Sequence, residues 1–106
     1  MNSRKNLSKR KGSFIGRDEI NHAFGRVLRN LRLEKGISQV ELATRADFDR
    51  TYPSLLERGL RSPTITVVVK LAEVLPVKSP GALLDLVIAE RANNQLSAPG
   101  QWGKRS

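Results

Sequence analysis

The side chains with the clearest chemical potential lie between residues 50 and 58. Arg50 can donate two hydrogen bonds to the O6 and N7 atoms of a guanine. Thr51 and Leu55 offer a hydroxyl group and apolar surface, which suit thymine methyl groups and neighbouring base edges. Because residues four apart share a helix face, a helix here would present Thr51 and Leu55 together, beside Arg50. The pattern predicts base contacts in double-stranded DNA; for Leu55 the alternative is an ordinary surface leucine.

A second set of polar side chains is typical of contacts with phosphate. Gln39 stands at an expected helix start, where its side chain and free backbone N–H groups can bind an anion; the alternative is plain solvation. Arg58 and Arg61 flank Gly59 and can bind phosphates farther along. Such contacts set the register on DNA without specifying sequence. The residues expected to contact the DNA backbone are Gln39, Tyr52, Ser54, Arg58 and Arg61.

Two short helices would position these side chains. Ser38 and Glu41 have the S-x-x-E spacing of a capping box, and Ile37 and Leu42 can pack against each other as its hydrophobic staple. These signals predict a first helix over residues 39–46. Its apolar face consists of Leu42, Ala43 and Ala46.

The second helix is expected over residues 50–58, with Asp49 as its N-cap, Phe48 buried before it and Gly59 as its stop. Pro53 would then occupy the fourth helical position, where its missing N–H would have formed the first intrahelical bond, so a start one or two residues later is the alternative. Two helices joined by a short turn predict a helix-turn-helix, whose second helix can enter the major groove.

Five short motifs follow one another between residues 38 and 75. They are Ser38-Gln39, Leu42-Ala43, Leu56-Glu57-Arg58-Gly59, Pro63-Thr64, and Leu71-Ala72 with Leu75. In this order and spacing they resemble the Xre-like, or Cro and phage-repressor-like, helix-turn-helix family, over residues 24–77. The chain is also similar to restriction-modification controller proteins and small repressors. The resemblance implies an all-α, five-helix, lambda-repressor-like fold and a transcriptional regulator of repressor or controller type.

The resemblance also implies roles for individual residues. Gln39 would contact the DNA backbone and brace the second helix. Arg32 and Glu57 would form a structural ion pair, so Glu57 is expected to be a scaffold residue and not a general acid. Asp47 stands where the family has glycine in the turn, and Asp tolerates the left-handed region better than most residues. Pro53 replaces the family's usual Ile or Val.

Three further helices are expected around this motif. The first spans residues 18–35, and Gly25 within it indicates the close approach of another helix. Residues 65–75 contain a β-branched run that is typical of a strand, but their apolar spacing and the resemblance favour a helix. The last helix is expected over residues 80–93, with Pro80 at its permitted first position.

The fifth helix is too apolar for a single packing contact. Leu83, Leu84, Leu86, Val87 and Ile88 cover an arc of about 200°, wider than the stripe that a surface helix needs. Deep burial within one copy is the alternative, but a domain this small offers no second layer to cover both sides. A homodimer interface formed by Leu84, Leu86, Val87 and Ile88 is therefore expected.

Positive charge is concentrated at the beginning of the chain. The net charge is +9, and residues 1–17 hold six basic side chains and no acid. Residues 36–63 are balanced, with four basic and four acidic residues, so the attraction for phosphate is expected to come largely from the arm. The predicted domain spans residues 18–93, between this arm, disordered when unbound, and a flexible tail over residues 94–106. A purely solvated leader remains the alternative for the arm.

Composition excludes several other classes of function. The chain has 106 residues, no cysteine and one histidine, His22, which leaves no thiolate metal site and no catalytic triad. Neither a membrane span nor a signal core is present. A cytoplasmic protein without enzymatic activity or cofactor is expected, and Trp102 in the tail indicates no function. The alternative to a DNA-binding homodimer is an antitoxin or another protein-interaction module that binds a toxin or other partner through the fifth helix or tail.

Overall fold

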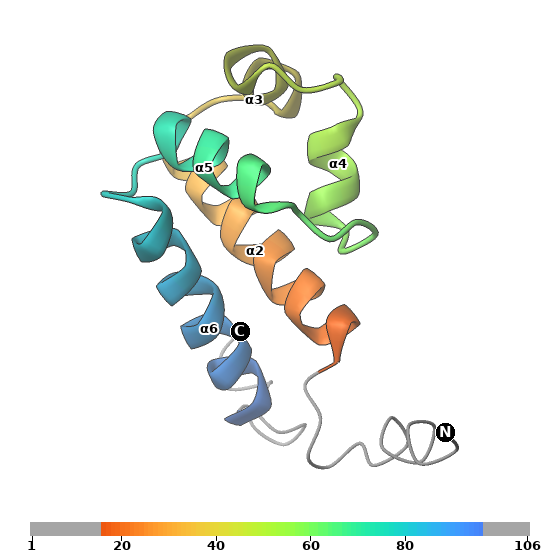
Figure 1. Ribbon diagram of the computed structural model, residues 1–106, viewed down its shortest axis with the longest axis vertical. Helices are drawn as coiled ribbons and strands as arrows, with labels where there is room; N and C mark the ends of the chain where they lie inside the picture. Colours follow the sequence, from red (N-terminus) through yellow and green to blue (C-terminus); the bar gives the residue numbers. More distant parts are fainter. Residues whose placement is uncertain (1–15, 97–106) are drawn as a thin grey trace.

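Apolar residues at helical spacing organise the chain into five helices across residues 16–96, the part that the computed structural model describes (Figure 1). The helices are α2 (Arg17–Lys35), α3 (Gln39–Ala46), α4 (Tyr52–Glu57), α5 (Ile65–Val74) and α6 (Pro80–Leu96). No strand occurs within these residues, so the predicted all-α class is confirmed. None of the helices within them is long and apolar enough to cross a membrane.

The observed helix bounds lie close to the expected ones, with α4 as the main exception. Helix α3 spans the expected residues, α2 begins at Arg17, α5 ends at Val74, and α6 continues to Leu96. The β-branched start of α5 is helical because Thr64 caps it, accepting a hydrogen bond from the backbone N–H of Val67 (3.1 Å). Apart from their helical ends, the expected basic arm and the tail with Trp102 lie outside the described residues.

Two long helices form the base of the fold. Helices α2 and α6 lie side by side and run in opposite directions, and α5 packs on α6 (Figure 1). Helix α4 packs against α2, while α3 contacts both α4 and α5. The pair α3–α4 therefore lies at one end of the molecule, supported from below by α2 and from the side by α5.

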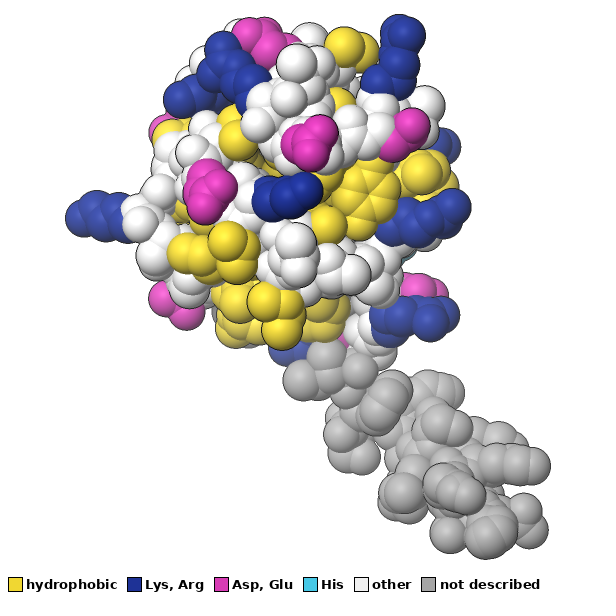
Figure 2. All heavy atoms as spheres, turned by 45° about the horizontal axis from the view of Figure 1, so that its top comes forward, with side chains coloured by type: hydrophobic (Ala, Val, Ile, Leu, Met, Phe, Trp, Pro, Cys, Tyr) yellow, Lys and Arg dark blue, Asp and Glu magenta, His cyan; other side chains and the backbone are white. Residues whose placement is uncertain are grey.

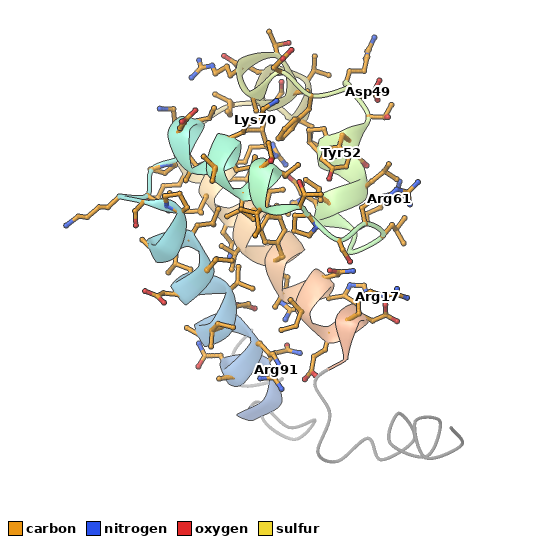
Figure 3. The ribbon with its side chains drawn as sticks, in the orientation of Figure 1. Arg17, Asp49, Tyr52, Arg61, Lys70 and Arg91 are labelled. Atoms are coloured by element: carbon orange, nitrogen blue, oxygen red, sulfur yellow. The ribbon has the colours of Figure 1, made fainter. Side chains whose placement is uncertain are left out.

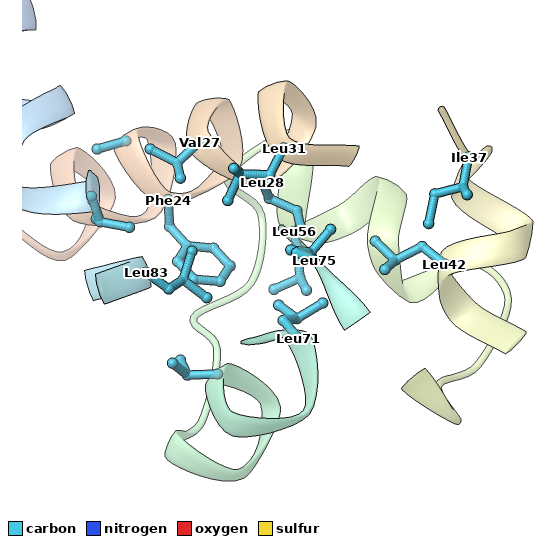
Figure 4. Close-up of a cluster of buried hydrophobic side chains, with 13 residues drawn as sticks. Phe24, Val27, Leu28, Leu31, Ile37, Leu42, Leu56, Leu71, Leu75 and Leu83 are labelled. Atoms are coloured by element: carbon cyan, nitrogen blue, oxygen red, sulfur yellow. The ribbon is translucent and has the colours of Figure 1, made fainter. Parts of the chain in front are cut away.

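Each helix contributes one fully buried leucine to the core (Figure 4). Their burial stabilises the fold by about 1.5–3 kcal/mol per side chain relative to exposure. Because one side chain from every helix meets the others, the helix-turn-helix is part of the single core and does not fold as an appendage. The five residues are Leu28, Leu42, Leu56, Leu71 and Leu83.

The connection from α2 to α3 follows the expected end signals. Gly36 ends α2 in the left-handed conformation (φ 79°), and the Ser38 hydroxyl then accepts a hydrogen bond from the backbone N–H of Glu41 (3.0 Å). The reciprocal half of the capping box is replaced, because the Glu41 carboxylate accepts a hydrogen bond from Arg45 (2.8 Å). The start of α3 is therefore capped by the Ser38 hydroxyl alone, without the reciprocal bond from Glu41.

Candidate nucleic-acid interface

The turn between α3 and α4 has the geometry that glycine usually provides. Asp47 lies in the left-handed region (φ 61°, ψ 51°) and closes α3 as its C-cap. The backbone N–H of Phe48 donates to the carbonyl of Ala43 (2.8 Å), which completes the turn. Asp is one of the few residue types that adopt this conformation at moderate cost. The departure from glycine at this position therefore leaves the turn intact.

Helix α4 begins later than expected. It starts at Tyr52 with Thr51 as N-cap, so the expectation of Asp49 as N-cap and a helix from residue 50 is wrong, and the alternative of a start one or two residues later is confirmed. The physical reason is Pro53, which now stands at the second helical position, where its missing N–H leaves no bond unmade. Arg50 consequently lies in the turn that precedes α4 and not on the helix itself.

The turn before α4 is held by Asp49, the residue that was expected to be the N-cap of this helix. One carboxylate oxygen of Asp49 accepts hydrogen bonds from both the backbone N–H (3.0 Å) and the hydroxyl (2.5 Å) of Thr51. The backbone N–H of Tyr52 donates to the Asp49 carbonyl (3.0 Å). The hydrogen bond from the Thr51 hydroxyl, followed by that from its N–H, lowers the pKa of Asp49. Asp49 is thus a fixed, ionised group on the exposed side of the turn.

Aromatic packing supports the start of α4 from the inside. The rings of Phe48 and Tyr52 meet edge to face, with centroids 5.3 Å apart and an interplanar angle of 81°. The ammonium group of Lys70 on α5 lies 5.7 Å from the Phe48 ring centroid. Desolvation of the half-buried Tyr52 raises the pKa of its phenol. Tyr52 therefore has a packing role in addition to the backbone contact expected of its hydroxyl.

The other end of α4 rests directly on α2. A Cβ atom on Gly25 would lie 2.5 Å from the carbonyl oxygen of Glu57 and 2.7 Å from that of Leu56. Only glycine allows this approach between the two backbones, as the sequence indicated for Gly25. The position of α4 relative to α2 is therefore determined by backbone contact as well as by side-chain packing.

A buried ion pair joins the same two helices. Arg32 donates to both carboxylate oxygens of Glu57, with Nε to Oε2 at 2.6 Å and Nη2 to Oε1 at 3.1 Å. The two side chains are only 8% and 4% exposed, and Arg32 also donates to the carbonyl of Ile37 (2.9 Å). Gln39 completes the network by donating from Nε2 to Glu57 Oε1 (2.9 Å). The bracing role that the resemblance implied for Gln39 has a direct structural basis in this hydrogen bond.

Gln39 keeps groups for an external ligand. Its Nε2 atom carries a second N–H, and its backbone N–H at the first position of α3 has no partner within the helix. Both are donors, as a phosphate requires. The buried network therefore orients Gln39 without using all of its hydrogen-bonding capacity.

The residues expected to contact bases differ in exposure. Arg50 and Thr51 are exposed, whereas Leu55 is half-buried, which leaves only part of its side chain for an external contact. Among the described residues the structure records no hydrogen bond or ion pair for Arg50. The structure brings Arg50 and Thr51 together at the start of α4, with Leu55 one turn after Thr51.

The residues expected to contact the DNA backbone lie along the same helix and after it. Ser54 is half-buried, and Arg58 and Arg61 are exposed. Figure 3 shows Asp49 and Arg61 at opposite ends of α4, both directed away from the body of the protein. No local pattern in the sequence indicates what holds the loop that carries Arg61. In the structure, buried Asn21 on α2 donates to the Ser62 hydroxyl (2.9 Å) and ties this loop to the core.

The exposed side chains of residues 36–63 carry a different net charge from the whole segment, because one acid is buried. Glu57 is one of their four acidic residues, and it is buried against Arg32, which lies outside the motif. The exposed surface of the motif therefore has more basic than acidic side chains, although acids remain among them. Figure 2 shows Lys and Arg side chains distributed around this end of the molecule, interspersed with Asp and Glu. The excess is a single positive charge, and the surface is not a continuous basic patch (Figure 2).

Helix α6 presents two kinds of apolar residue. Leu83 is fully buried, and Val87, one turn later on the same face, is 2% exposed, so the assignment of Val87 to a dimer interface is wrong. Leu84, Leu86 and Ile88 remain exposed. The expected arc of apolar residues is therefore divided between the core and the surface.

An apolar groove of about 520 Å³ lies between α2, α5 and α6. Leu84 borders it together with Ile65 and Val69, all of which are exposed, and Ile65 is 83% exposed. Leu86 lies on another side of α6, beside Asn30 of α2. The exposed leucines of α6 thus belong to two different surfaces.

The chain is similar to a known protein family and to several named proteins. A family model described as helix-turn-helix matches residues 28–81, about half of the chain. The chain is 39% identical over 69 residues to "Control protein C.BamHI" of Bacillus amyloliquefaciens, across 64% of this chain and 84% of that protein.

Two further relatives are named as HTH-type transcriptional regulators, both uncharacterized. The chain is 47% identical over 47 residues to y4dJ of Sinorhizobium fredii, across 44% of this chain and 61% of the relative. It is 42% identical over 48 residues to YqaF of Bacillus subtilis, across 45% of this chain and 63% of the relative. The match therefore spans less than two thirds of each of these two relatives.

Proposed function

The chain belongs to the helix-turn-helix family, and on that premise we propose that it is a DNA-binding transcriptional regulator that acts as a homodimer on a partly palindromic operator. The observation that supports this most directly is the way α4 is held. A buried ion pair, a backbone contact at Gly25 and an anchored loop fix the helix from inside, while Arg50 and Thr51 remain exposed outside. A rigid support with exposed polar side chains is the arrangement that recognition in a major groove requires.

In this proposal, base and backbone contacts come from different parts of the interface. Arg50 would contact a guanine from the turn before α4, and Thr51 and the exposed part of Leu55 would contact neighbouring base pairs. Contacts to the phosphate backbone would fix the register of the protein on the duplex. They are assigned to Gln39, Tyr52, Ser54, Arg58 and Arg61.

Two copies would place their α4 helices in successive major grooves, about 34 Å apart. The exposed side chains Leu84, Leu86 and Ile88 are the candidates for the contact between copies. Leu84 and Ile88 are four residues apart and share a face of α6, so we assign them to one interface.

Occupation of promoter DNA by such a dimer is compatible with repression and with activation at a second site. No cofactor and no catalytic step are involved.

A second function is favoured by the apolar groove. Exposed Ile65, Val69 and Leu84 border a groove large enough to receive side chains of another protein, as an antitoxin would use to bind its toxin. DNA binding and protein binding differ in their response to salt. Affinity for DNA should fall by about 0.9 log units per log unit of salt for each phosphate neutralised.

Selection from a pool of random duplexes at a stated salt concentration tests the proposal. We expect enriched sequences with two similar half-sites separated by one helical turn, and a protein-to-duplex ratio of two copies per site. Binding of all duplexes with equal affinity would contradict sequence-specific regulation. A flat salt dependence would instead favour the protein-interaction function.

A further inference from the structure

An acidic side chain lies on the surface assigned to DNA, at the end of α4 that carries Arg50 (Figure 3). Asp49 is exposed beside Arg50, and one of its carboxylate oxygens is occupied by the backbone N–H and the hydroxyl of Thr51. Among the described residues, no donor is recorded for the other oxygen, Oδ1. A carboxylate on a DNA-contacting surface repels the phosphate groups of DNA unless a hydrogen-bond donor meets it there. The two hydrogen bonds from Thr51 account for the place of Asp49 in the turn, and on a DNA-contacting surface the carboxylate is favourable where a donor group on the DNA meets Oδ1.

We propose that Asp49 and Thr51 together form a hydrogen-bond acceptor for the exocyclic amino group of a cytosine in each half-site, an inference that rests on the function proposed above. In the major groove, only the N4 group of cytosine and the N6 group of adenine are donors. A carboxylate has no hydrogen to donate, so these are the only base groups that it can bind favourably.

The geometry of the pair explains why Thr51 belongs to the acceptor. Its hydroxyl hydrogen is directed to Asp49 at an oxygen–oxygen distance of 2.5 Å, so it is not available to a base acceptor. Toward DNA, Thr51 therefore offers only oxygen lone pairs and its methyl group. The same two hydrogen bonds hold the Asp49 carboxylate in one orientation and lower its pKa, so it remains ionised at neutral pH.

Cytosine suits this acceptor better than adenine. The N6 group of adenine lies between two acceptors in the major groove, its own N7 and the O4 of the paired thymine. Both would repel a carboxylate. The N4 group of cytosine has such a neighbour on one side only, the O6 of the paired guanine. That O6 and the adjacent N7 are the atoms that Arg50 can bind, so neighbouring residues of opposite charge suit the two bases of a C·G pair.

The decisive variant is Asp49→Asn. The amide keeps an oxygen for the two hydrogen bonds from Thr51 but presents N–H donors where Oδ1 was an acceptor. We expect the preference for cytosine at one position of each half-site to fall by about 10-fold, in the range of a single lost base contact. A gain of guanine or thymine at that position would support the inference equally, because the amide N–H groups can donate to the O6 of guanine or the O4 of thymine.

Asp47→Asn is the matched control. It removes the same charge two residues away, and asparagine adopts the left-handed conformation of this position (φ 61°) readily. We expect tighter binding to all duplexes and an unchanged base preference. Thr51→Ser should keep the cytosine preference, because it retains both donors to Asp49, whereas Thr51→Val should weaken it.

All variants are compared by selection from random duplexes, after circular dichroism has shown that they are folded. If Asp49→Asn binds more tightly but selects the same sequence as Asp47→Asn, Asp49 contributes only charge and the inference is overturned. If the wild-type protein selects a defined site without a cytosine dependent on Asp49, the inference fails and the proposed function stands. If it selects no site, both fail.

Discussion

Replacement of Glu57 by alanine tests the support beneath α4 most directly. Both side chains of the Arg32–Glu57 pair are more than 90% buried, and their closest atoms are 2.6 Å apart. Alanine at position 57 would leave the guanidinium with the carbonyl of Ile37 as its remaining acceptor and would deprive Gln39 of its partner. A buried charge without its counterion destabilises a fold strongly, so we expect the free energy of unfolding to fall by about 3 kcal/mol.

The assay is thermal unfolding followed by circular dichroism. For a domain of this size, a loss of about 3 kcal/mol lowers the Tm by about 12–24 °C. Glu41→Ala is the matched control, because it removes an ion pair with Arg45 whose side chains are 44% and 45% exposed. That pair should contribute less than about 1 kcal/mol. Equal and small shifts for Glu41→Ala and Glu57→Ala would refute the reasoning, because they would mean that the buried pair stabilises no more than an exposed one.

Three further predictions concern DNA contact, helix packing and assembly. Arg50→Ala should lose about 1–3 kcal/mol of binding free energy on the selected site while non-specific binding stays nearly constant; equal losses on both DNAs in a binding titration would mean that Arg50 contacts only phosphate. Gly25→Ala should lower the Tm, although alanine normally stabilises a helix by about 1 kcal/mol relative to glycine, because the new Cβ would lie 2.5 Å from the Glu57 carbonyl; a raised Tm would show that α2 and α4 separate easily. Leu84→Asp combined with Ile88→Asp should shift the protein from dimer to monomer in sedimentation experiments, whereas Leu33→Asp, an equally exposed leucine on α2, should not. A dimer that persists in the double variant would place the interface elsewhere.

The parts of the fold that were predictable are those determined by local signals. The Ser38 cap and the left-handed Gly36 delimit α3 and α2 through backbone groups only a few residues away. Gly25 is informative because glycine inside a helix is unfavourable unless another element needs the space. These features depend on the identity of one residue and its near neighbours.

The parts that were not predictable depend on competition between elements. The start of α4 was expected at residue 50 with Asp49 as N-cap, or one or two residues later because of Pro53, and the structure has the later start, which the Asp49–Thr51 hydrogen bonds favour. Val87 was assigned to a dimer because periodicity alone cannot show which half of an apolar arc meets the core. The Asn21–Ser62 hydrogen bond joins residues 41 positions apart, and no local pattern indicates it.

The late start of α4 has a consequence for how recognition would work. A helix of six residues has little stability of its own, because helix formation is cooperative and its first turn is unfavourable. The position of the turn that carries Arg50 and Asp49 must therefore come from tertiary contacts. These contacts are the Phe48–Tyr52 packing, the buried ion pair and the backbone contact at Gly25. Substitutions at such supporting residues should impair specific binding as much as substitutions at the DNA contacts themselves, even though none of the supporting groups, apart from the partly exposed Tyr52, would touch DNA.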